Sequence, residues 1–307
     1  MSLTGELHLK TTPLRIWFDR TFPTFKAVQP SARWTGPLGV APLASVPWRG
    51  RVGTAFDYRV RWWWPWTPSV RLIGMEAVAP IFLGENSTDS LRRYLDTTIA
   101  SLAATTSRGE PSDDVEDHLA RAALVLAQLE TVQRSHLPPD PASTGIAKGA
   151  SVEAMLATQD ARAVDDVIAL SRAARDPLAR FVNRSAALNP TFSWSNRVGG
   201  ADADLIVDGC LLELKTSCDT GLTGEVARQL LGYILLDGDD RYQIRDLAVF
   251  YARRPQVLRW PVAEFVDACS ARSVGVAVLR AEVNALLPTV GPIEACQPDP
   301  NQLDLFG

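Results

Sequence analysis

The stretch of sequence that decides the fold is GGADADLIVDGCLLELKTS, residues 199–217. Asp208-Gly209 at its centre is the pair most typical of a two-residue turn between antiparallel strands. With the turn at that place, counting outward puts Asp204 opposite Glu213 on the two strands. The stretch therefore predicts a β-hairpin that holds two carboxylates side by side.

The two faces of this hairpin differ in chemistry, because successive side chains of a strand point to opposite faces. One face is apolar and should point to a core: Leu205, Val207, Leu212 and Leu214. The other face is charged, with Lys215 opposite Asp202: Asp202, Asp204, Glu213 and Lys215. Such a face is either a solvated surface, on which the lysine offsets the acids, or a site.

A metal site is the interpretation that we favour. Opposed Cβ atoms lie about 5 Å apart, so Asp204 and Glu213 repel each other unless a proton or a cation lies between them. Mg²⁺ or Mn²⁺ suits this pair, and the carbonyl of Leu214 is a further candidate ligand. A bound ion can polarise a phosphoryl oxygen and activate a water, which Lys215 could help to position.

The next segment, TGEVARQLLGYILL at 223–236, has the pattern of a helix. Gln229 and Tyr233 are four residues apart and therefore share one helix face. Arg228 beside them could contact a phosphate of DNA. The alternative is that Gln229 is a surface residue and Tyr233 a core residue.

These residues carry a resemblance to a known family. The segment resembles the PD-(D/E)xK nuclease superfamily, with Asp204 as the aspartate and Glu213-Leu214-Lys215 as the Glu-x-Lys. The RecB-like branch carries a Gln-x-x-x-Tyr helix after that strand, and residues 229–233 match it. The resemblance implies a restriction-endonuclease-like core, an α/β fold with a mixed central sheet flanked by helices. It also implies a Mg²⁺- or Mn²⁺-dependent nuclease in which these strand and helix residues are catalytic.

Two further features are judged against the family pattern. RecB-like members often carry a histidine on an early helix in a Gly-x-x-x-His context, and here Gly53-Thr-Ala-Phe-Asp57 has an aspartate instead. Asp57 could bind metal or contact DNA. Some members hold an iron–sulfur cluster with four cysteines, three of them closely spaced. We expect no cluster here, because the cysteines are far apart: Cys210, Cys218, Cys269 and Cys296.

The rest of the chain is expected to be mostly helical. Apolar periodicity predicts helices at 87–104, 112–135, 151–172, 175–187, 222–236 and 261–272. Strands are predicted at 201–217, 244–252 and 274–279. Residues 11–84 should be irregular and strand-rich, although Arg51–Arg61 could instead be a short helix. Strands that alternate with helices predict a mixed α/β domain behind a helical and irregular N-terminal part.

Composition and charge narrow the class of protein. The chain has 307 residues, 46% of them hydrophobic, and a net charge of −4. It has no apolar run long enough for a membrane span and no secretory signal, so we expect a cytoplasmic, nucleoid-associated protein without a membrane partner. Residues 1–66 hold nine Lys/Arg against three Asp/Glu, with tryptophans at 62–64 and 66. This region either contacts DNA or fills a core with its aromatic rings.

Four parts are expected along the chain. Residues 1–110 form the basic, tryptophan-rich region, and residues 111–190 a helical region that packs on the core. Residues 191–292 form the nuclease core, and residues 293–307 a flexible tail.

The tail carries a second motif. It ends in Asn-Gln-Leu-Asp-Leu-Phe-Gly, which resembles the short Gln-Leu-x-Leu-Phe peptide that binds the bacterial sliding clamp, the DNA polymerase III beta subunit. Leu305 and Phe306 would fill an apolar pocket, and Gln302 would form hydrogen bonds at its rim. Alternatively, the tail folds back and buries Leu303 together with the other two apolar residues in this protein's own core.

Both motifs lead toward DNA. We expect a metal-dependent DNA nuclease that the sliding clamp recruits during repair or replication. A non-catalytic DNA- or clamp-binding module with a nuclease-like fold is one alternative, and it should tolerate EDTA. A restriction or phage-defence endonuclease is the other, and it should cut at specific sites.

Overall fold

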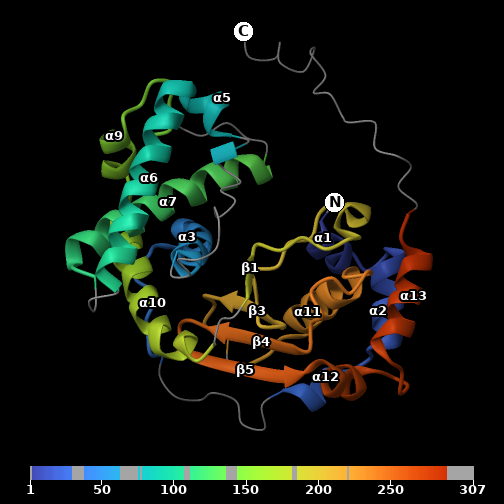
Figure 1. Cartoon of the computed structure of the whole chain (residues 1–307). Coiled ribbons are helices and arrows are strands. Elements are labelled where there is room, and N and C mark those ends of the chain that lie inside the picture. Colours follow the sequence, from blue (N-terminus) through green and yellow to red (C-terminus); the bar gives the residue numbers. More distant parts are fainter. Residues whose placement is uncertain are drawn as a thin grey trace, which may run out of the picture.

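The computed structural model describes residues 2–29, 38–62, 75–76, 78–106, 111–135, 144–181, 185–219 and 221–288. Within these ranges one mixed sheet lies between two layers of helices (Figure 1), which confirms the predicted α/β class with a central sheet flanked by helices. The strands follow the order of the chain across the sheet: β1 (Ala186–Leu188), β2 (Leu205–Val207), β3 (Cys210–Lys215), β4 (Asp246–Tyr251) and β5 (Gln256–Pro261).

The sheet combines an antiparallel meander with one parallel pair. Strands β1, β2 and β3 pair antiparallel, and β4 pairs antiparallel with β5. Strand β4 lies parallel to β3, and the helix α11 (Gly224–Leu236) makes the crossover between them. The parallel pair therefore occupies the middle of the sheet.

The predicted hairpin register is confirmed where β2 and β3 pair. Leu205 lies opposite Leu212, and the turn is made by Asp208 (φ 49°) and Gly209 (φ 77°). Two consecutive left-handed residues are what a type I′ turn requires, which explains the preference for Asp-Gly there.

One detail of the predicted register is wrong. Asp202 does not lie opposite Lys215, because the pairing of β2 with β3 begins only at Leu205. Asp202 forms an isolated bridge with Thr191 instead. The hydrogen bond from the Asn189 N–H to the Asp204 carbonyl (3.0 Å) shows where this segment joins β1. Backbone pairing with the segment that follows β1 therefore replaces the outer half of the hairpin.

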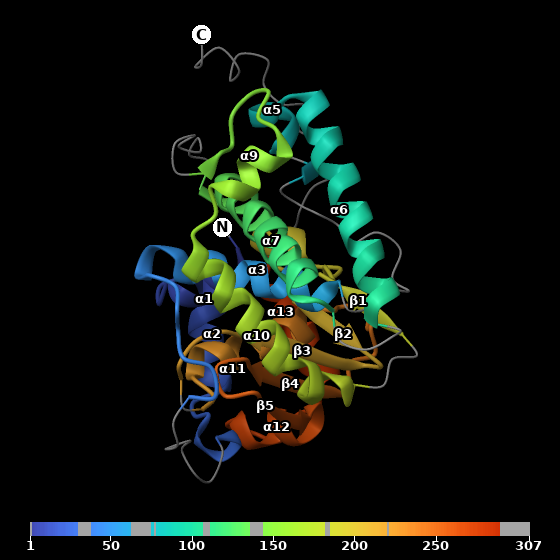
Figure 2. The same cartoon turned by 90° about the vertical axis from the view of Figure 1, so that its left-hand side faces the viewer.

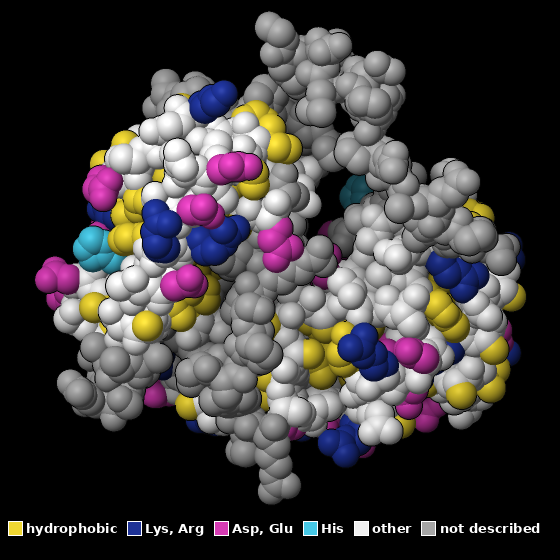
Figure 3. Space-filling model, turned by 45° about the horizontal axis from the view of Figure 1, so that its top comes forward, with side chains coloured by type: hydrophobic (Ala, Val, Ile, Leu, Met, Phe, Trp, Pro, Cys, Tyr) yellow, Lys and Arg dark blue, Asp and Glu magenta, His cyan; other side chains and the backbone are white. Residues whose placement is uncertain are grey.

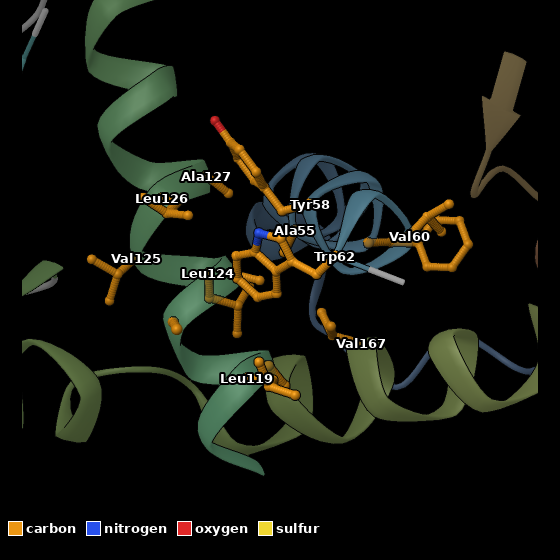
Figure 4. Close-up of a cluster of buried hydrophobic side chains, with 14 of the residues drawn as sticks. Ala55, Tyr58, Val60, Trp62, Leu119, Leu124, Val125, Leu126, Ala127 and Val167 are labelled. Carbon is orange, nitrogen blue, oxygen red and sulfur yellow. The ribbon is translucent and has the colours of Figure 1, made fainter. Parts of the chain in front are cut away.

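One layer of helices covers the sheet face that carries Leu205, Val207 and Leu212. Helix α3 contacts this face through Phe56, whose ring centroid lies 6.3 Å from that of Phe250 in β4. Helices α7 and α10 pack on α3, and the remaining helices extend the layer. Figure 4 shows labelled side chains from the α3 segment and from α7 meeting in this core. The layer comprises α3 (Arg49–Arg61), α5 (Ala79–Leu83), α6 (Glu85–Thr106), α7 (Asp113–Ser135), α9 (Val152–Ala157) and α10 (Ala161–Ala179).

The second layer covers the opposite face of the sheet (Figure 2). Ile206 and Leu211 of the hairpin pack there, so the charged face of the hairpin is also a core face at its turn end. Because α1 and α2 join this layer, the first residues of the chain pack against its last helices. The layer comprises α1 (Leu3–His8), α2 (Pro13–Thr21), α11, α12 (Val262–Cys269) and α13 (Val276–Leu286).

The prediction of strands within 11–84 is wrong for the described residues, since no strand precedes β1 in them. The segment forms α2, α3 and α5 with short 3₁₀ turns at Lys26–Val28 and Val46–Trp48. The helical alternative for Arg51–Arg61 is confirmed by α3. Prolines suggested irregular structure, but Pro13, Pro47 and Pro80 lie in the first turns of helical segments, where the missing N–H costs no hydrogen bond.

Three other boundaries differ from the prediction. The helix expected at 151–172 is two helices, because the Asp160 side chain caps a new start by accepting a hydrogen bond from the Ala163 N–H (2.9 Å). The described residues of 175–187 form no separate helix, since α10 continues to Ala179 and β1 begins at Ala186. The strand expected at 274–279 is the start of α13, where Leu279 and Val283 form a buried helical stripe. Another strand, β5, was not predicted, because its exposure shows no clear alternation.

The predicted helices at 87–104, 112–135, 222–236 and 261–272 are present as α6, α7, α11 and α12, and the strand at 244–252 is present as β4. Among the described helices, none combines the length and the apolar character that a membrane span needs.

Candidate functional site

A cavity of about 950 Å³ lies where the two helical layers meet at the carboxyl end of β3. Helices α3 and α7 form one wall, and α11 forms another. The loop at Gly199-Gly200 and the start of α1 line the rim. The cavity brings together residues that the sequence analysis singled out: Asp57, Asp204, Glu213, Leu214, Lys215, Gln229 and Tyr233.

Arg228 is the predicted DNA contact that does not line this cavity. Its guanidinium lies 3.2 Å from the Asp19 carboxylate and 5.1 Å from the centroid of the Phe25 ring. These contacts tie α11 to the N-terminal segment. Figure 3 shows basic and acidic side chains interspersed on the face in view, without one large basic patch.

A chain of hydrogen bonds holds Lys215 in place. Its Nζ donates to Glu213 Oε1 (2.7 Å) and to Gln229 Oε1 (3.1 Å). Gln229 Nε2 in turn donates to the hydroxyl of Tyr233 (2.7 Å). The Tyr233 ring is fixed from behind by stacking on Phe192, with ring centroids 5.4 Å apart. The Gln-x-x-x-Tyr pair therefore orients the lysine.

Asp204 is fixed by the backbone of the opposite strand. Its Oδ2 accepts a hydrogen bond from the Leu214 N–H (2.6 Å). Burial raises the pKa of Asp204, while Lys215 and this N–H act in the opposite direction. The carboxylate of Asp204 thus lies beside Glu213, and one of its two oxygens already accepts a backbone hydrogen bond.

Glu213 has the most perturbed environment of the pair. Its side chain is 4% exposed, and burial together with the Asp204 charge raises its pKa from 4.5 to about 7, although Lys215 opposes the shift. Glu213 Oε2 is buried and has no hydrogen-bond partner among the described residues. An unpartnered buried carboxylate oxygen is costly unless a cation binds to it.

The donor set at this point fits a divalent ion with few protein ligands. Asp204, Glu213 and the Leu214 carbonyl offer oxygen atoms, which Mg²⁺ and Mn²⁺ prefer. Within the described part of the chain, no group of three or more His, Cys, Asp or Glu side chains is arranged to hold a metal ion. An ion here would therefore keep water or phosphate ligands, as Mg²⁺ commonly does with one or two carboxylates.

Helix α3 closes the cavity because Gly53 lets it approach the end of β3. A Cβ at Gly53 would lie 3.0 Å from Thr216 Oγ1, closer than ordinary van der Waals contact. One turn further along the helix, Asp57 lines the cavity and forms an ion pair with Arg61. The spacing Gly-x-x-x-Asp thus brings an acid to the site and makes room for the helix that carries it.

Two charged residues at the site were missed by the sequence analysis. Arg61 lines the cavity from α3, and Glu130 lines it from α7. The four-residue spacing from Asp57 could have indicated Arg61. Glu130 is 5% exposed and lies in a helix with an apolar stripe, a position where an acid needs a partner. Its partner is the hydroxyl of Tyr58, at 2.7 Å.

The acids on the α3–α7 wall also influence one another. Burial raises the pKa of Asp57 well above its usual range, and the charges of Asp204 and Glu130 add to the shift. Arg61 acts in the opposite direction by pairing with Asp57. The cavity is therefore acidic on both walls, with Lys215 on one and Arg61 on the other.

Comparison with known proteins found no matching family model, no matching curated protein and no matching solved structure. The clamp-like motif, Cys296 and the tryptophans at 63, 64 and 66 lie outside the described residues. The functional proposal therefore depends on the residues of the cavity and on the sequence of the tail.

Proposed function

We propose that this protein is a Mg²⁺- or Mn²⁺-dependent deoxyribonuclease of the PD-(D/E)xK kind, recruited to DNA by the bacterial sliding clamp. The observation that carries the proposal is the arrangement around Glu213. A buried, unpartnered carboxylate oxygen lies beside Asp204, and a lysine held by Gln229 and Tyr233 lies next to it.

Each of these residues has a distinct task in phosphodiester hydrolysis. Asp204 and Glu213 would hold the ion, with the Leu214 carbonyl as a further ligand. Burial alone would lower the pKa of Lys215, but the charges of Glu213 and Asp204 outweigh burial and raise it. The lysine therefore stays protonated and can stabilise negative charge that develops on the phosphate.

Gln229 and Tyr233 of α11 support that role by orienting the lysine. Gln229 accepts from Lys215 and donates to Tyr233, so the amide fixes the direction of the ammonium group. Burial raises the pKa of Tyr233 well above its usual range, which keeps the phenol neutral. When bound, a divalent ion at this site would supply Lewis-acid polarisation of the phosphoryl oxygen and a water of lowered pKa.

The direct test is a cleavage assay on labelled single-stranded, duplex and branched DNA, with Mg²⁺, Mn²⁺ or EDTA. We expect cleavage that requires metal and that falls at least about a hundredfold in Lys215→Ala, because a single preorganised charge at the reacting centre contributes on this scale. Lys148→Ala is the matched control, since Lys148 is exposed and does not line the cavity.

The same assay separates the alternatives. Binding to DNA that survives EDTA, without cleavage of any substrate, would contradict the nuclease and favour a non-catalytic module. Cleavage confined to particular sequences would favour a restriction or phage-defence endonuclease. Equal activity of Lys215→Ala and Lys148→Ala would remove Lys215 from the mechanism.

The clamp enters the proposal through the tail. Gln302, Leu303, Leu305 and Phe306 match the clamp-binding peptide, and a short linear motif of this kind binds through a few apolar anchors. We expect the double variant Leu305→Ala/Phe306→Ala to bind purified bacterial sliding clamp at least about a hundredfold more weakly, as measured by surface plasmon resonance.

Asp304→Ala is the control for that experiment, because it changes the variable position of the motif and leaves the anchors in place. Cleavage of naked DNA should be the same in the wild type and in both variants. Clamp binding that is unaffected by loss of both anchors would contradict this part of the proposal.

A further inference from the structure

The cavity contains two fixed positive charges, and only one of them belongs to the Glu-x-Lys motif. Lys215 pairs with Glu213 on the sheet side. Arg61 lies on the α3 side, where the carboxylates of Asp57 and Glu130 line the same cavity.

Arg61 is fixed in the wall of the cavity by its contacts with Asp57 and Tyr58. Its side chain is 5% exposed, and its guanidinium faces both carboxylate oxygens of Asp57, with Nε 3.0 Å from Oδ1. The guanidinium carbon lies 5.4 Å from the centroid of the Tyr58 ring. Tyr58 donates its hydroxyl hydrogen bond to Glu130 and so links the pair to α7.

The charge of Arg61 influences an acid on the opposite side of the cavity. It acts to lower the pKa of Asp204 on the hairpin, and Asp57, Asp204 and Glu130 all act to keep Arg61 protonated. A guanidinium does not lose its proton in proteins. A permanent cation therefore lies where acids from α3, from α7 and from the residue before β2 face one another.

Many phosphodiester-cleaving sites place two metal ions side by side between such acids. Here the oxygens of Asp57 are already used by Arg61, whereas Glu213 Oε2 on the other side has no partner among the described residues. The two sides of the cavity thus differ: Arg61 faces both oxygens of Asp57, whereas Lys215 pairs with only one oxygen of Glu213.

We infer that Arg61 takes the place of a second metal ion, so that the cavity binds a single divalent cation on the Asp204–Glu213 side. The inference rests on the proposed metal site and specifies its stoichiometry. Removal of the Arg61 charge should leave Asp57 without its ion-pair partner and create a second cation position beside it, on the wall that Glu130 also lines.

The test counts bound ions and does not depend on cleavage. Isothermal titration calorimetry of the full chain with Mn²⁺, supported by electron paramagnetic resonance of the free ion, should give one ion for the wild type. Arg61→Met should bind two, and the matched control Arg49→Met, exposed on the same helix, should bind one. Asp57→Asn/Arg61→Met should return to one ion, because the second position then lacks its aspartate.

Circular dichroism and thermal unfolding would establish that each variant is folded. If Arg61→Met does not fold, Arg61→Gln, whose amide can still donate to Asp57, replaces it. Two ions in the wild type, or one ion in folded Arg61→Met and Arg61→Gln, would overturn this inference and leave the nuclease proposal standing. No Mn²⁺ bound to the wild type would overturn both.

Discussion

Replacing Glu213 with Gln should abolish metal-dependent cleavage while leaving the protein folded. The substitution keeps the shape of the side chain but removes the negative charge from the oxygen that we assign to the ion. Metal ions contribute several kcal/mol to such reactions, so we expect a loss of at least about a thousandfold in the cleavage rate. The measurement is single-turnover cleavage of the preferred substrate at saturating Mn²⁺.

The stability of Glu213→Gln, measured against pH, gives a second test that needs no metal. The folded-state pKa of Glu213 is raised from 4.5 to about 7, chiefly by burial. Between about pH 4.5 and pH 7 the folded chain therefore keeps a proton that the unfolded chain has lost. In EDTA, the stability of the wild type should fall as pH rises through this window and level off above pH 7. Glu213→Gln should lack this part of the fall.

Glu264→Gln is the control for both readouts. Glu264 lies in the first turn of α12, its side chain is exposed, and it does not line the cavity. It should cleave DNA at close to the wild-type rate and retain the wild-type pH profile of stability. Full cleavage by Glu213→Gln would contradict the metal assignment, and an unchanged pH profile would contradict the buried acid.

Replacing Asp166 with Ala should cause the largest loss of stability. Asp166 of α10 is fully buried and forms an ion pair with Arg253, with Nη2 2.9 Å from Oδ2, and it also accepts the Ala44 N–H at 3.2 Å. Removing one member of a buried ion pair leaves an uncompensated charge and costs about 3–5 kcal/mol. Chemical denaturation should show this difference in the free energy of unfolding.

Asp165 offers a matched control, because it is the preceding residue of the same helix and is exposed. Asp165→Ala should change the free energy of unfolding by less than about 0.5 kcal/mol. Asp166→Leu/Arg253→Met should recover much of the loss, since apolar residues can replace a buried pair. If the two alanine variants were equally stable, the ion pair would have no structural role.

This ion pair also supports the candidate site. Arg253 Nε donates to the carbonyl of Thr216, the residue that follows Lys215 (3.2 Å). The end of β3 is therefore fastened to α10 at the point where Gly53 brings α3 close. We expect Asp166→Ala to weaken any activity that depends on Lys215, as a consequence of the lost anchor.

The sequence was most informative where local chemistry determines local structure. Asp208-Gly209 forced the turn, and the register of Leu205 with Leu212 followed from it. The outer half of the hairpin could not be predicted, because Asp202 pairs with Thr191, which belongs to another part of the chain. The start of α13 was mistaken for a strand because an apolar run of a few residues has no distinctive period.

The residues of the candidate site likewise fall into two groups: those that a sequence pattern could bring together, and those that only packing brings to the cavity. Asp204, Glu213 and Lys215 share a hairpin, and Gln229 lies on the helix that follows, so short-range patterns were sufficient to group them. Glu130 is separated from these residues by a long stretch of chain, and only the packing of α7 on α3 brings it to the cavity. No pattern within a single helix reports such an arrangement.

The parallel pairing of β3 with β4 has a consequence for the moment at which the protein becomes active. β3 carries Glu213 and Lys215, and it is held on its second edge by residues 246–251. A chain still emerging from the ribosome has every charged residue of the cavity before it has that strand. Under the proposed function, an unfinished or truncated chain that ends before Asp246 cannot cut DNA. Under that function, the order of synthesis keeps incomplete chains inactive.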